Sequence, residues 1–218
     1  MSLDGRSVRT VATLQADRVS WPTWSPDGRR IAFGYDHLYV VDSGGGRPRD
    51  LRAGGCCPAW GPGGRKIAYS GSPEAQAEVY VMNPDGRRQE IVAYPDEGHS
   101  YWGPTWSPQG QKLAFYADEE PDMAGHVKTS LAMIGRFRGK VRYLRSGPYA
   151  LEPDWSPDGR KIAFDGIRVL DLATGRVVKL HDGTHPRWSP DGRRLAFVDD
   201  HQIFVMRADG SNVRQLTR

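Results

Sequence analysis

Histidines and carboxylates are the side chains of this chain that could support metal-dependent chemistry. The 218 residues include six histidines: His37, His99, His126, His181, His185 and His201. Imidazole and carboxylate groups can bind a divalent metal ion together, at about 2.0–2.2 Å for Zn²⁺. The candidates for a metal-assisted reaction are His99, His126, His181 and His185. No ligand spacing among them is diagnostic, so we predict no metal and no other cofactor.

Nucleophilic chemistry has less support. The chain lacks the Gly-x-Ser-x-Gly motif that presents a hydrolase serine. Its two cysteines, Cys56 and Cys57, are adjacent, and neighbouring residues of a strand point to opposite faces. We therefore expect no disulfide between them, but two small buried side chains without a redox or metal role.

Composition and charge limit the remaining classes of function. The 26 glycines and 16 prolines favour many short strands joined by tight turns. No apolar stretch is long enough to span a bilayer, and the first seven residues do not read as a secretory signal. The net charge of +4 raises nucleic acid as a partner, but no aromatic residues interleave with the basic ones to form a stacking platform. We expect no nucleic-acid partner.

A repeat supplies the elements that must position these side chains. Five copies of a P-x-W-S-P-D-G-type segment occur at 22–33, 58–69, 104–115, 153–164 and 186–197. In each copy Pro and Gly favour a turn, and alternating apolar residues predict a second strand. Third strands are predicted at 38–41, 79–82, 131–134, 169–172 and 203–206, and fourth strands are clearest at 141–144, 177–180 and 213–216.

Four antiparallel strands in about 40 residues are typical of a propeller blade. A single blade leaves apolar faces uncovered, and stacking around an axis buries them. We therefore predict that the repeated tryptophans are core residues: Trp24, Trp60, Trp106, Trp155 and Trp188.

These copies resemble the WD40-like repeat of TolB-type propellers, P-x-W-S-P-D-G-R-x-I-A-F, over residues 8–218. The same repeat occurs in propellers of tricorn-like and prolyl-oligopeptidase-like proteases and in oligogalacturonate lyases. The resemblance implies an all-β propeller of four-stranded antiparallel blades, with five blades here, or six or more if the chain is a fragment of a larger propeller. We expect residues 8–218 to form one domain and residues 1–7 to be disordered or an added segment. We also expect a closed ring, with residues 8–14 as a clasp strand.

The order of strands sorts the loops onto two sides of the ring. Basic residues follow the turns within each hairpin, whereas all six histidines and most of the acidic residues fall on the opposite side. The longest loops, 94–103 and 116–126, lie on this acidic side, and loops on a rigid frame commonly carry function. The residues just before each motif proline should surround the channel: Trp21, Cys57, Gly103, Glu152 and His185.

We predict a binding site, without catalytic residues, at the channel rim and the 94–103 loop. It comprises Trp21, Glu97, His99, Tyr101, Trp102, Glu152 and His185. The predicted function is a monomeric, non-catalytic scaffold that binds a protein or peptide. The alternatives are a metal-assisted polysaccharide lyase or hydrolase, and an accessory propeller of a larger protease. The resemblance suggests a periplasmic or extracytoplasmic location, and the residues themselves leave the location open.

Overall fold

The chain forms twenty β-strands in a computed structural model, which describes residues 9–13, 21–34, 37–71, 76–96, 98–119, 127–135, 139–146 and 151–217. The predicted N-terminal segment 1–7 lies outside these residues. The described part contains no helix, and thus none that could cross a bilayer.

The strands form five sheets of four, and each sheet is one blade. Blade 1 contains β1 (Thr23–Trp24), β2 (Arg30–Gly34), β3 (His37–Asp42) and β4 (Arg49–Gly54). Blade 2 contains β5 (Cys56–Trp60), β6 (Ile67–Gly71), β7 (Glu78–Met82) and β8 (Glu90–Ala93). Blade 3 contains β9 (His99–Trp106), β10 (Leu113–Glu119), β11 (Thr129–Ile134) and β12 (Arg142–Ser146).

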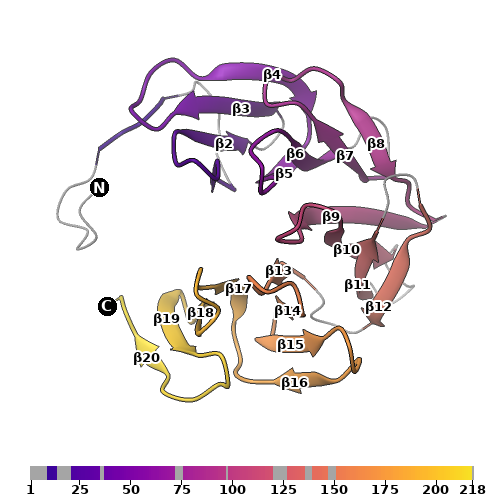
Figure 1. Ribbon diagram of the computed structural model, residues 1–218, viewed down its shortest axis with the longest axis vertical. Helices are drawn as coiled ribbons and strands as arrows, with labels where there is room; N and C mark the ends of the chain where they lie inside the picture. Colours follow the sequence, from indigo (N-terminus) through magenta and orange to yellow (C-terminus); the bar gives the residue numbers. More distant parts are fainter. Residues whose placement is uncertain are drawn as a thin grey trace.

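Blades 4 and 5 complete the arrangement. Blade 4 contains β13 (Asp154–Trp155), β14 (Lys161–Phe164), β15 (Arg168–Asp171) and β16 (Val177–Lys179). Blade 5 contains β17 (Thr184–Trp188), β18 (Arg194–Asp199), β19 (Gln202–Arg207) and β20 (Arg214–Gln215). Consecutive strands pair antiparallel in every blade, and the first strand of each blade lies nearest the axis (Figure 1). The predicted five-bladed, all-β propeller is confirmed.

The Ser-Pro-Asp-Gly turn of blade 4 shows how the motif begins a hairpin. Ser156 Oγ donates to Asp158 Oδ1 at 2.6 Å and accepts from the Lys161 N–H at 2.9 Å. Asp158 also accepts from the Arg160 N–H at 3.0 Å, and these hydrogen bonds lower the pKa of Asp158. Blades 1 and 5 repeat these contacts, whereas blade 2 has glycine at both positions and retains main-chain hydrogen bonds.

Each motif tryptophan after the first packs against the preceding blade. On blade 4, Ala163, Ile167 and Val169 form a buried socket that shares a hydrophobic cluster with Trp188 of blade 5. The equivalent sockets of blades 1 to 3 share clusters with Trp60, Trp106 and Trp155 respectively. Trp60, Trp106 and Trp155 are 6–9% exposed, which confirms the prediction that they are core residues.

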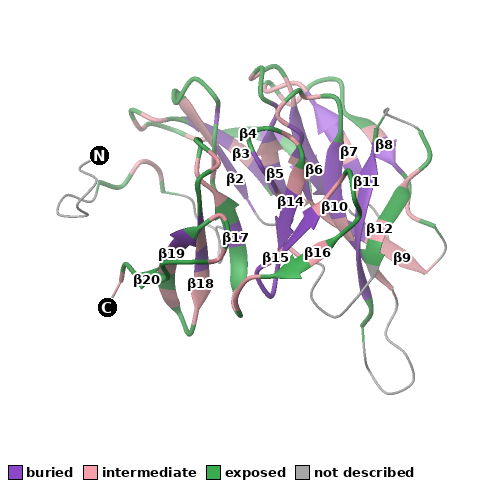
Figure 2. Cartoon of the chain, turned by 60° about the horizontal axis from the view of Figure 1, so that its bottom comes forward, coloured by how far each residue is buried: buried purple, intermediate pink, exposed green. Residues whose placement is uncertain are grey.

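The strands of the described residues leave the ring open between blade 1 and blade 5 (Figure 1). Trp24 is 51% exposed, so the prediction that it is a core residue was wrong. On blade 5, Ala196, Ile203 and Val205 occupy the socket positions, but Ile203 is 44% exposed. In Figure 2 buried strands predominate in blades 2 and 3, whereas β17, the inner strand of blade 5, is mainly exposed. We call the face of blade 1 that carries Trp24 and the face of blade 5 that carries Ile203 the seam.

The expected clasp strand is not found in residues 9–13, the described part of segment 8–14. These residues lie against blade 1, where Val11 O accepts from the Gly46 N–H at 3.2 Å. The Arg9 guanidinium donates to the carbonyl oxygens of Ser43 and Gly44 at 3.0 and 2.9 Å. Blade 5 already has its own fourth strand, β20, at the position that a clasp would take. The expected closure of the ring is therefore not seen among the described residues.

Candidate functional site: the mouth pocket

The inner strands surround a central pocket of about 280 Å³. We call it the mouth pocket, and its lining residues are Trp21, Pro22, Thr23, Cys57, Pro58, Ala59, Gly103, Pro104, Thr105, Glu152, Pro153, Asp154 and Arg187. Blades 1 to 4 each contribute the residue before the motif proline, the proline, and the variable x of P-x-W, whereas blade 5 contributes only its x residue, Arg187. The loops leading into the inner strands lie at this end of the ring, so the pocket opens on the side where the sequence predicts the histidines and most of the acidic residues.

All five residues before the motif proline adopt a left-handed backbone conformation. The φ angles are 51° at Trp21, 59° at Cys57, 58° at Gly103, 50° at Glu152 and 56° at His185. Bulges interrupt the ladders of blades 2, 3 and 5 here, and a bulge redirects a side chain out of the normal alternation. Left-handed conformation is uncommon for residues other than glycine, so its recurrence identifies a property of the fold.

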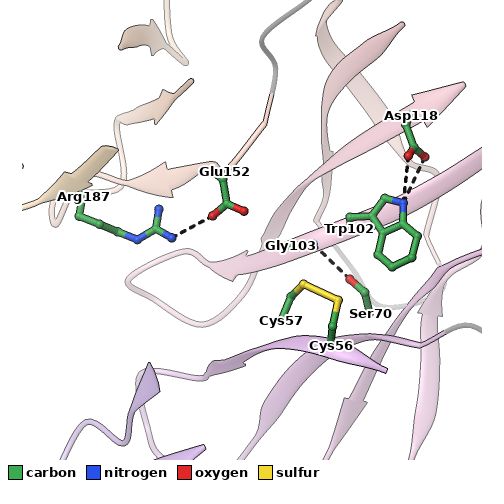
Figure 3. Close-up of a disulfide and its surroundings, with 8 residues drawn as sticks. All are labelled: Cys56, Cys57, Ser70, Trp102, Gly103, Asp118, Glu152 and Arg187. Atoms are coloured by element: carbon green, nitrogen blue, oxygen red, sulfur yellow. Dashed lines mark hydrogen bonds and ion pairs between the residues drawn. A yellow bond between two sulfur atoms is a disulfide. The ribbon is translucent and has the colours of Figure 1, made fainter. Parts of the chain in front are cut away.

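Cys56 and Cys57 are joined by a disulfide at the mouth pocket, so the expectation that they are unbonded was wrong (Figure 3). That expectation assumed strict alternation along the strand. The bulge at Cys57 removes the alternation and allows both sulfur atoms to lie on one side. Both cysteines are buried, as predicted, with 7% and 8% exposure, and Cys57 lines the pocket.

Charged groups from blades 4 and 5 meet in the pocket lining. Arg187 Nη2 lies 3.0 Å from Glu152 Oε2, and the Glu152 side chain is the more buried of the two (Figure 3). Asp154 accepts from the Trp188 N–H at 2.7 Å, and burial raises the pKa of Asp154. Two carboxyl groups thus accompany one guanidinium among the lining residues.

Further acidic groups lie behind this lining. Asp165 is 6% exposed, and its Oδ1 accepts from the His185 N–H at 2.7 Å. Burial raises the pKa of Asp165 to about 6. Burial also raises the pKa of Tyr116, with a smaller contribution from the Glu152 charge. The pocket environment therefore disfavours additional negative charge.

The structure brings part of the predicted site together. Trp21 and Glu152 line the mouth pocket, whereas His185 is exposed and is not among the described lining residues. Trp102 directly precedes the lining residues of blade 3. Its indole N–H is shared between both carboxylate oxygens of Asp118, at 3.1 and 3.2 Å (Figure 3).

Tyr101, which was predicted to belong to the binding site, is not among the described lining residues of the mouth pocket. It is fully buried, its ring packs against Phe115 with centroids 4.7 Å apart, and its hydroxyl lies 2.9 Å from that of Tyr143. His99 is partly buried and packs against the Tyr143 ring at 5.6 Å, outside the pocket lining. Glu97 lies outside the described residues.

The histidines proposed as metal ligands do not form a shared site in the described part of the chain. His99 Nε2 lies 3.9 Å from Glu119 Oε1, and His181 Nδ1 lies 3.9 Å from Asp199 Oδ2. His126 lies outside the described residues. Among those described, no three histidine, cysteine or acidic side chains are grouped to hold a metal ion.

Sequence reasoning missed the variable residue of P-x-W. All five of these residues line the pocket: Thr23, Ala59, Thr105, Asp154 and Arg187. A signal was available, because this position changes chemical type between copies while the flanking proline and tryptophan stay constant. Variation within an otherwise constant repeat indicates a position that the fold itself leaves free.

The fold is a β-propeller, and the pocket at its axis is lined by two carboxyl groups and one guanidinium. Residues 1–164 match the family model of the TolB beta propeller domain, and the chain therefore belongs to this family. Residues 158–218 match the model of the dipeptidyl peptidase IV N-terminal region. A comparison with curated proteins finds no match.

Solved structures share the fold at low sequence identity. TolB from Acinetobacter baumannii is 21% identical with a TM-score of 0.71, and the match covers 93% of this chain and 55% of that one. A structure assigned to TolB of Agrobacterium tumefaciens is 22% identical with a TM-score of 0.75, covering 91% and 80% respectively. The tricorn protease is 14% identical with a TM-score of 0.64, covering 90% and 26%. The chain thus spans about half the length of the Acinetobacter protein.

Proposed function

We propose that this TolB-family propeller is a non-catalytic module that binds a protein or peptide at the mouth pocket. The group inserted there is a cation, such as a lysine side chain or a free amino terminus. The observation that carries this proposal is the presence of two carboxyl groups, Glu152 and Asp154, and a single guanidinium, Arg187, in the lining of a pocket of about 280 Å³.

The size and charge of the pocket support this choice. A volume of about 280 Å³ lies just below the usual range of ligand pockets, which begins near 300 Å³, and suits one side chain or chain terminus. Charges in a concave, partly desolvated site interact more strongly than charges on an open surface. Burial has already raised the pKa of Asp154 and Asp165, so a bound cation would stabilise their ionised forms.

A panel of fluorescent hexapeptides tests the charge preference. The peptides differ at one central residue (Lys, Glu or norleucine) and carry a free or an acetylated amino terminus. We expect the lysine peptide to bind tightest by fluorescence anisotropy. Glu152→Gln should weaken its binding on the order of tenfold, because about 1.4 kcal/mol of attraction corresponds to that factor. Arg187→Gln should strengthen it, because the competing cation is removed.

Glu119→Gln is the matched control, since Glu119 is another acidic residue of this side but is not among the lining residues. It should leave binding unchanged. Equal binding of lysine and glutamate peptides would reject the proposal. So would weakening by both Glu152→Gln and Arg187→Gln in variants whose thermal unfolding shows that they remain folded.

A role as the accessory propeller of a protease is the second candidate, supported by the match of residues 158–218 to the dipeptidyl peptidase IV N-terminal region. Such a propeller would admit many peptides. The same panel separates the two functions, because an accessory role predicts binding that is independent of the central residue.

A further inference from the structure

The backbone that places Cys56 beside Cys57 does not depend on the disulfide. Trp21, Glu152 and His185 occupy the position of Cys57 in other blades, and their φ angles of 50–56° match the 59° of Cys57. These residues form no such bond, so the fold imposes the conformation. The two sulfur atoms would therefore remain neighbours after reduction, ready to bond again.

The disulfide lies beside the mouth pocket and beside the junction of blades 2 and 3, so a change in its oxidation state can alter both. Cys57 lines the mouth pocket, whereas Cys56 is not among the lining residues. Cys56 is opposite Ser70 in the sheet of blade 2, and Ser70 Oγ accepts from the Gly103 N–H of blade 3 at 3.1 Å (Figure 3). The pair thus contacts both the pocket and the junction of blades 2 and 3.

We propose that Cys56–Cys57 is a redox-active site whose oxidation state sets the shape of the mouth pocket. Disulfide sulfurs lie about 2 Å apart, whereas unbonded heavy atoms settle about 3.5–4 Å apart. Reduction must therefore separate the two sulfurs. Cys56 is paired with Ser70 in the sheet, whereas Cys57 lines the pocket, so the Cys57 sulfur moves toward the pocket and reduces the space for a ligand. The effect on binding rests on the proposed function.

The reductant is a small dithiol, and the exchange balances without another reactant. One thiolate of the dithiol attacks the sulfur of Cys57, the cysteine that lines the pocket, and Cys56 leaves as a thiolate that takes up a proton. The second thiol of the reductant then displaces Cys57. The dithiol becomes a cyclic disulfide, and two electrons and two protons convert the cysteine pair into two thiols.

Thiol titration gives a clean test, because the chain has only two cysteines. Protein purified without reductant should show no free thiol after denaturation, and protein treated with dithiothreitol should show two. Two thiols in the protein purified without reductant would overturn the proposal. Binding of the lysine hexapeptide should weaken on the order of tenfold on reduction. The double variant Cys56→Ser/Cys57→Ser should show no response to dithiothreitol.

Amide hydrogen exchange at Gly103 supplies a readout that needs no ligand. Reduction should accelerate this exchange, because movement of Cys56 disturbs the Ser70 acceptor opposite it. Faster exchange without peptide binding in either state would support the redox site and reject the proposed function. Unchanged exchange together with unchanged peptide binding would overturn the redox site.

Discussion

Trp106 and Trp24 occupy the same position of the same repeat in very different surroundings. Trp106 is 9% exposed between blades 2 and 3, and its Nε1 donates to the Ala59 carbonyl at 3.1 Å. Trp24 faces the seam and is 51% exposed. The repeat therefore specifies the blade, whereas the neighbouring blade decides whether its tryptophan becomes a core residue.

The socket of blade 5, on the opposite face of the seam, is also uncovered because no blade in the described part of the chain packs against it. Ile167 on blade 4 is fully buried beneath Trp188, whereas its counterpart Ile203 is 44% exposed. The seam therefore presents a tryptophan on one face and an uncovered socket on the other. Exposed apolar patches of this kind are uncommon on soluble domains and favour association.

Alanine substitutions at the two tryptophans should give the largest difference between the regions. Trp106→Ala should lower the free energy of unfolding by about 3–5 kcal/mol, because it leaves a cavity and removes the hydrogen bond to Ala59. Trp24→Ala should cost about 1 kcal/mol or less. Urea titration followed by circular dichroism measures both. Equal losses would mean that the seam is closed in solution, and the comparison would fail.

The junction of blades 4 and 5 offers a pH-dependent test through Asp165, which accepts a hydrogen bond from His185 across it. The folded-state pKa of Asp165 is about 6, above the usual 3.8, so the folded state binds the extra proton between these values. Its contribution to stability is present at low pH and is lost as the pH rises through 6.

Asp165→Asn keeps an acceptor oxygen and removes the charge. The variant should match the wild type near pH 4 and exceed it near pH 7.5 by about 1–3 kcal/mol in unfolding free energy. Urea unfolding at several pH values measures the difference. A difference that does not change with pH would show that the junction does not bury an ionised carboxylate.

Most of the fold could be predicted because each blade is specified locally. The third strand predicted at 131–134 lies within β11, and the fourth strand predicted at 177–180 nearly coincides with β16. The rim position could be predicted as well, because aligning the copies places Trp21 and Glu152 at equivalent sites, and both line the pocket.

The remaining features depend on backbone geometry that residue types do not reveal. The disulfide was missed because a bulge at Cys57 breaks the alternation that the prediction assumed. The burial of Tyr101 was not predicted because its loop continues as the long strand β9, which turns the side chain into the core. The seam was not predicted because the sequence of a blade does not show whether another blade packs against the faces that carry Trp24 and Ile203.

The turn glycines provide the smallest and most closely matched test of the comparison. Gly28 and Gly110 have nearly equal φ angles of 68° and 69°, so alanine strains the backbone equally at both. A Cβ at Gly110 would lie 3.1 Å from Pro62 Cγ of the preceding blade, whereas one at Gly28 would have no atom within 4 Å. Gly28→Ala should cost about 1 kcal/mol, and Gly110→Ala a few tenths more. Thermal unfolding of the pair measures this difference. A larger loss at Gly28 would place a neighbouring blade against blade 1 in solution, because only packing distinguishes the two positions.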